Sequence, residues 1–148
     1  MGRPHRGVVG ASRYAQRLRE DLINAAEDQH NRTLMIRGEP GLGKDNLAAL
    51  VHFGSSQRSK LLVRLGPTDL KKKADVLLNS IGENTLLVSG VDQLDPDQQQ
   101  RLAAMGNGQH PGFSGRVIFE PPVLLPEEQF LELDLLRRRT HGRLRQRR

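Results

Sequence analysis

The feature that most constrains this chain is a glycine-rich octapeptide, Gly-Glu-Pro-Gly-Leu-Gly-Lys-Asp, which runs from Gly38 to Asp45. It matches the phosphate-binding template G-x-x-x-x-G-K-[ST] at every position except the last, where Asp45 replaces Ser or Thr. The apolar residues 33–36 before it predict a buried strand, and residues 45–51 after it have the pattern of a helix. Strand, glycine loop and helix therefore follow one another in the order that a phosphate-binding loop requires.

A loop of this kind directs backbone N–H groups and a helix N-terminus at phosphate oxygens. We therefore expect weak binding of ATP or ADP with Mg²⁺, with Lys44 reaching the outer phosphates. Asp45 is the predicted metal ligand, directly or through water, although its charge also repels phosphate. The predicted nucleotide-binding residues of the loop are Gly38, Glu39, Pro40, Gly41, Leu42, Gly43, Lys44 and Asp45. The alternative is a glycine-rich turn that enters a helix and holds no ligand.

The composition limits the other classes of site. A chain of 148 residues suits one domain with a single core. The absence of cysteine excludes disulfides, thiolate metal sites and cysteine nucleophiles, and it agrees with a reducing, cytoplasmic location. No apolar run reaches the length that spans a membrane. The five histidines are scattered without metal-ligand spacing, so we expect surface or helix-capping roles for them.

The positive charge is concentrated at the C-terminal end. Seven arginines lie after residue 136, and removing their charges from the formal net charge of +6 leaves −1. The body is therefore nearly neutral, and the tail is expected to bind nucleic acid without sequence specificity. One tyrosine, no tryptophan and no recognisable reading motif make this signal purely electrostatic.

The remaining sequence alternates between helical and strand patterns. Ser12 is the predicted N-cap of an amphipathic helix that ends near residues 28–31, and Pro96 is predicted at the first position of a later helix. Further strands are expected over residues 60–65, 85–88 and 116–119, with another helix over residues 70–81.

The order of charges predicts the structure at the end of the chain. Acidic residues early and arginines late predict a helix from Glu127 to about Arg138, and disorder is expected from Thr140 onward. The predicted organisation is a basic arm over residues 1–7, an α/β domain over 8–139, and a disordered basic tail over 140–148.

The sequence from Val8 to about Phe119 resembles the AAA+ domain of bacterial enhancer-binding proteins, the activators that remodel sigma-54 RNA polymerase. The family opens with an apolar pair, Gly and Ser, as in Val8-Val-Gly-Ala-Ser12, and its loop reads G-E-x-G-x-G-K-E. An acidic residue at the position of Asp45 is thus a family habit. The resemblance adds Val9 and Gly10 to the predicted nucleotide site. It implies a three-layer, P-loop NTPase-like α/β domain with a mostly parallel sheet.

A second block, Asn84 to Leu94, resembles the family's Walker B strand, G-T-L-F-L-D-E-I-x-x-L. Ser89 and Gly90 stand at the two acidic positions. The first acid helps to hold the Mg²⁺ shell and the second orients the attacking water. Asp92 and Asp95 lie past the predicted strand end. The resemblance therefore implies a domain that is not an active ATPase.

Other parts of the family pattern are missing. No G-A-F-T-G-A loop, which contacts the sigma factor, occurs in the chain, and Glu120-Pro-Pro122 stands where the family has a polar sensor. The AAA+ lid and the arginine fingers have no counterpart. The chain is similar to a shortened, degenerate AAA+ domain of the kind found in larger cyanobacterial regulators.

The predicted function is a cytoplasmic, ATP-binding regulatory domain, deficient in hydrolysis, which acts in transcriptional regulation by binding a protein partner such as the transcription machinery. One alternative is a protein-interaction module that binds no nucleotide. Another is a nonspecific nucleic-acid binder that acts through the arginine-rich tail. The sequence does not fix the oligomeric state.

Overall fold

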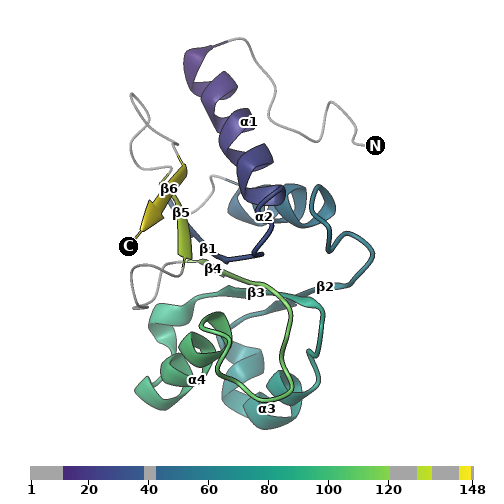
Figure 1. Ribbon diagram of the computed structural model, residues 1–148. Helices are drawn as coiled ribbons and strands as arrows, with labels where there is room; N and C mark the ends of the chain where they lie inside the picture. Colours follow the sequence, from purple (N-terminus) through teal and green to yellow (C-terminus); the bar gives the residue numbers. More distant parts are fainter. Residues whose placement is uncertain (1–11, 39–42, 121–129, 135–143, 148) are drawn as a thin grey trace.

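The computed structural model describes residues 12–38, 43–120, 130–134 and 144–147, and its centre is a six-stranded sheet (Figure 1). The strand order is β2-β3-β4-β1-β5-β6, and every neighbouring pair is parallel except β5 and β6. The strands are β1 (Thr33–Arg37), β2 (Leu62–Leu65), β3 (Thr85–Ser89), β4 (Val117–Glu120), β5 (Phe130–Asp134) and β6 (Leu144–Arg147). The four strands predicted from the sequence share this one sheet.

Helices cover both faces of the sheet. In Figure 1, α1 and α2 lie on one side of the strands and α3 and α4 lie on the other. The helices are α1 (Arg13–Ala26), α2 (Lys44–Phe53), α3 (Pro67–Asn79) and α4 (Pro96–Gly106), with a 3₁₀ turn η2 (Val91–Gln93). The predicted three-layer α/β fold is confirmed. Within the part of the chain that is described, no helix is long and apolar enough to cross a membrane.

Each face of the sheet has its own core, because side chains alternate along a strand. Leu34 and Ile36 pack with α1 and α2, whereas Met35 between them packs with α3 and α4. The same alternation separates Leu87 of β3 from Val88. Burial on both faces of the sheet therefore explains why the strands carry continuous runs of apolar residues.

The predicted helix starts are confirmed. Ser12 Oγ accepts a hydrogen bond of 3.0 Å from the amide of Ala15, which satisfies one of the open donors of α1. Pro96 is the first residue of α4, where its missing N–H has no cost.

The prediction for the end of the chain is wrong for the residues that the structure describes there, 130–134 and 144–147. Phe130–Asp134 is a strand, not part of a helix, and Leu144–Arg147 pairs with it instead of being disordered. The sequence of β5 alternates, with Leu131 and Leu133 buried, which is the period of a strand. The decisive factor is tertiary, because β1 has an open edge opposite β4 that β5 fills over five residue pairs. The predicted arm over residues 1–7 lies outside the described residues.

His52 is also not the surface or capping residue that was expected. Its side chain is buried in α2, where Nε2 donates to the carbonyl of Lys60 at 2.9 Å and Nδ1 lies 2.8 Å from Thr85 Oγ1. With Nε2 as the donor, Nδ1 accepts from the hydroxyl. The ring therefore ties the end of α2 to the start of β3.

We predict an acid sensitivity from this contact. Burial lowers the pKa of His52 below 6.5, against the raising effect of the Lys60 carbonyl. The stability that neutral His52 provides is thus present above pH 6.5 and is lost as the pH falls through the lowered pKa. His52→Gln, which keeps a donor for Lys60, is expected to show a smaller loss of thermal stability between pH 7 and pH 5 than wild type. His110→Gln, on a loop, is the control. If it reduced the loss of thermal stability as much as His52→Gln does, the acid sensitivity would not come from His52.

Candidate nucleotide site

The predicted phosphate-binding loop joins the carboxyl end of β1 to the first residue of α2. Gly38 follows the strand, and Gly43 precedes the helix in the left-handed conformation, with φ of 73°. A residue with a side chain is strained at this φ, so glycine is required there. Four predicted binding residues, Glu39, Pro40, Gly41 and Leu42, lie outside the described residues, as do Val9 and Gly10.

Lys44 is the first residue of α2, and its ammonium turns back toward the end of β1. Its Nζ donates a hydrogen bond of 2.8 Å to the carbonyl of Gly38, across the two ends of the glycine segment. The charge is therefore held where the helix N-terminus also favours an anion. A phosphate at this position would compete with the Gly38 carbonyl for the ammonium.

Asp45, the predicted metal ligand, has two neighbours. Its carboxylate forms an ion pair with Arg64 of β2, and its charge acts on the carboxyl group of Glu120 at the end of β4. Both Asp45 and Arg64 are largely exposed, so their ion pair adds little to stability.

Glu120 is a site residue that the sequence analysis missed. The residue is 6% exposed, and its Oε2 has no hydrogen-bond partner among the described residues. Burial and the nearby charge of Asp45 raise its pKa to about 7, while Lys44 and Arg64 act in the opposite direction. A signal was present in the sequence, since this carboxylate ends an apolar strand at the edge where ligands bind in parallel α/β sheets.

The pKa of Glu120 leads to a stability prediction. Because the folded-state pKa lies near 7 and the ordinary value is 4.5, the protein loses stability as the pH rises through this window. Glu120→Gln removes the buried ionisation and keeps the size of the side chain. We expect it to stabilise the protein at pH 8 by about 1–3 kcal/mol, and by much less at pH 5.

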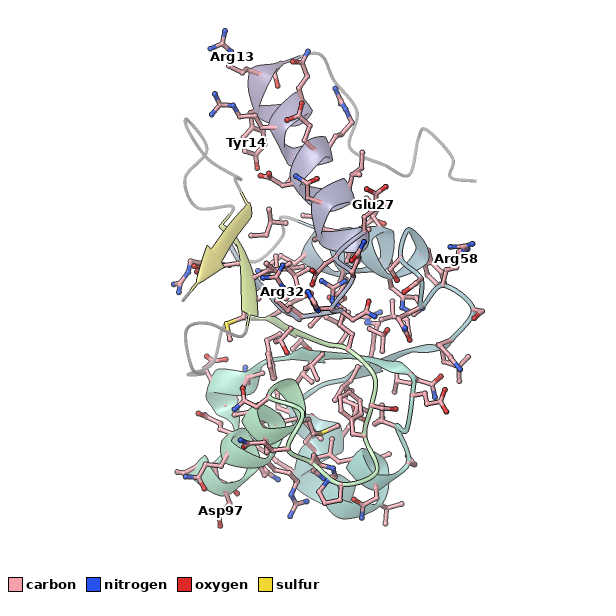
Figure 2. The ribbon with its side chains drawn as sticks, viewed as in Figure 1. Arg13, Tyr14, Glu27, Arg32, Arg58 and Asp97 are labelled. Atoms are coloured by element: carbon pink, nitrogen blue, oxygen red, sulfur yellow. The ribbon has the colours of Figure 1, made fainter. Side chains whose placement is uncertain are left out.

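Urea unfolding at the two pH values measures this difference. Asp97→Asn, at the exposed start of α4 (Figure 2), is the control for removing an acidic charge. A gain for Glu120→Gln that is the same at pH 5 and pH 8 would show that Glu120 ionises normally.

The Walker B positions lie beside Glu120. β3 ends at Ser89, which is the register partner of Glu120, and the amide of Gly90 donates to the Glu120 carbonyl at 2.8 Å. Neither Ser89 nor Gly90 supplies a carboxylate. Gly90 has φ of 67°, and a Cβ built there would lie 2.4 Å from Cγ of Pro67. Pro67, the first residue of α3, therefore occupies the space that the side chain of the family's second acid would need.

The two other nearby acids have different roles. Asp92 is exposed on η2, and Asp95 caps α4, where its Oδ1 accepts from the amide of Gln98 at 2.8 Å. Within the described ranges, no three His, Asp or Glu side chains form a group that would hold a metal ion. Of the predicted site residues that are described, the structure brings together Gly38, Gly43, Lys44 and Asp45.

A cavity of about 480 Å³ lies at the amino end of β1, opposite the end of the strand that leads to α2. Its lining includes Arg32, Thr33, Asn107 and Phe113, at the amino ends of the strands and the end of α4. Gly38, Gly43 and Lys44 are not part of its described lining.

Comparisons with known proteins bear on the family and the fold of the chain. The sequence model of the sigma-54 interaction domain matches residues 9–121. The transcriptional regulator VasH of Vibrio cholerae is 40% identical over 60 residues, which are 40% of this chain and 11% of VasH. The chain is thus much shorter than this relative.

Solved structures show the same fold. NtrX from Brucella abortus in complex with ADP has a TM-score of 0.58 and 20% identity, over 75% of this chain and 30% of NtrX. The P-loop NTPase domain of the sigma-54 transport activator from E. coli has a TM-score of 0.56 and 20% identity, over 71% of this chain and 84% of that domain. At this identity, the likeness concerns the fold alone.

Proposed function

Because the chain belongs to the sigma-54 interaction domain family, we propose that it is an ATP- or ADP-binding regulatory module that acts in transcription by binding a protein partner. The observation that carries the proposal is the position of Lys44, at the N-terminus of α2 directly after the left-handed Gly43, with its ammonium turned to Gly38. The complex of NtrX with ADP supports the choice of ligand.

The same proposal holds that bound ATP is not turned over at a useful rate. Phosphoryl transfer depends on a positioned metal and a positioned water. Ser89 and Gly90 supply neither acid, Asp95 is engaged as a helix cap, and Pro67 fills the space beside Gly90. The module would therefore signal by its nucleotide-bound shape. A role in transcription also implies a cytoplasmic location, while the partner protein and a contact of the tail with nucleic acid stay predictions.

Calorimetric titration with ADP and with ATP tests the nucleotide site. We expect dissociation constants in the micromolar to millimolar range for wild type. Lys44→Ala removes a charge-assisted contact to phosphate, and it should weaken binding by about thirtyfold or more, which is about 2 kcal/mol.

Lys71→Ala is the matched control, because this exposed lysine of α3 carries the same charge away from the loop. Its affinity should equal that of wild type. Equal affinities for wild type and Lys44→Ala, or no binding by folded wild type, would leave the interaction module without nucleotide as the better account.

A further inference from the structure

Two carboxyl groups meet beside the phosphate loop from different parts of the chain. Asp45 comes from the first turn of α2, and Glu120 comes from the carboxyl end of β4, 75 positions later in the chain. The charge of Asp45 acts on Glu120, which is more than nine-tenths buried with Oε2 unpartnered among the described residues, at the end of a strand that pairs with β1. Burying an acid beside another acid is unfavourable in the absence of a cation. Lys44 and Arg64 offset part of this cost, and the unpartnered Oε2 leaves a further position that suits a positively charged ligand.

The chemistry of this pair matches one ion. Mg²⁺ in nucleotide sites is held by one or two carboxylates together with phosphate oxygens and water. Asp45 replaces the hydroxyl residue that normally ligates the ion at this loop position. The acid at the end of β3, which would complete the set, is replaced by Ser89, and the register partner of Ser89 on β4 is Glu120.

We propose that Asp45 and Glu120 together form the Mg²⁺ seat of the bound nucleotide, with Glu120 on β4 taking over from the carboxylate that β3 lacks. The inference rests on the proposed nucleotide binding. Lys44 and Arg64 partly offset the negative charge of the pair until the metal is bound. Glu120 is a ligand in this arrangement, and no role for it in activating water is implied.

The test is the affinity for ADP with and without Mg²⁺, measured by calorimetry. In wild type, Mg²⁺ should strengthen binding about tenfold or more, which is 1.4 kcal/mol. In Glu120→Gln and in Asp45→Asn most of this gain should disappear. Without Mg²⁺ both variants should bind ADP more tightly than wild type, because one negative charge near the phosphates is gone. This opposite effect in the two conditions separates a metal ligand from a residue that only supports the loop.

Asp92→Asn is the matched control, because it removes an exposed acid just past the end of β3. It should keep the full Mg²⁺ effect. Mn²⁺ in place of Mg²⁺ gives a second readout, since electron paramagnetic resonance should detect Mn²⁺ held with ADP in wild type and lost in Glu120→Gln.

Three outcomes are decisive. An Mg²⁺ gain in folded Glu120→Gln equal to that of wild type overturns the assignment of Glu120. Lys44-dependent ADP binding that Mg²⁺ does not strengthen in wild type overturns the metal seat and leaves the nucleotide site standing. Absence of nucleotide binding overturns both.

Discussion

Replacing Gly90 by glutamate, the acid that the related Walker B motif carries at this position, is expected to destabilise the protein by about 3 kcal/mol. Two effects add. The left-handed φ of 67° strains any residue with a Cβ, and a Cβ at this position would lie 2.4 Å from Cγ and 2.9 Å from Cδ of Pro67. Restoring the lost carboxylate would therefore disrupt the contact between the end of β3 and the start of α3.

Gly82→Glu separates the two effects. Gly82 has a similar φ of 64°, but a Cβ there would have no atom within 4 Å. Gly82→Glu should therefore destabilise the protein only through backbone strain, by about 1–2 kcal/mol. Adding Pro67→Ala to Gly90→Glu should recover part of the loss in denaturant unfolding. Equal losses for Gly82→Glu and Gly90→Glu would show that Pro67 does not close this position.

A second large loss is expected from Arg116→Met, again about 3 kcal/mol. Arg116 is 2% exposed, and it donates to the carbonyls of Arg32 at 2.7 Å and Ala25 at 2.9 Å. These bonds tie β4 to the end of α1 and to the segment before β1. Methionine fills a similar volume but leaves the two carbonyls without this donor.

The guanidinium of Arg116 keeps its positive charge although the side chain is buried. Burial lowers its pKa to about 10, and the carboxylate of Asp28 opposes this shift, so the guanidinium remains protonated at neutral pH. Arg58→Met is the control. Figure 2 shows Arg58 at the periphery, where it makes a bond of 3.3 Å to the carbonyl of Ser55. A loss for Arg116→Met as small as that for Arg58→Met in urea unfolding would contradict the structural role.

The sequence predicted the elements whose pattern is local. The apolar runs of β1 and β3, the N-cap at Ser12 and the start of α4 at Pro96 all lie where periodicity and capping chemistry place them. The phosphate loop was found in the same way, because its glycine spacing is itself the signal.

The features that were missed depend on tertiary contacts. β5 forms because β1 has an open edge, and charge order near Glu127 and Arg138 gave no information on that edge. His52 is buried because two other segments supply its partners. The meeting of Glu120 with Asp45 needs the strand order, which brings β4 between β3 and β1.

Gly90 illustrates the same limit in another form. The sequence indicates that a carboxylate is missing, whereas only the structure indicates that Pro67 occupies its space. The loss of the acid and the packing of α3 are therefore linked, which a motif comparison does not reveal.

The central claim is that this module holds ATP through Lys44 without hydrolysing it. The most direct measurement is a quenched reaction with the protein in excess over γ-labelled ATP and Mg²⁺, in which bound ATP and released phosphate are followed together. We expect wild type to bind the label, Lys44→Ala not to bind it, and the γ-phosphate to stay intact over minutes. Phosphate release by wild type at roughly one per second or faster, abolished in Lys44→Ala, would contradict it, as would a folded wild type that binds no ATP.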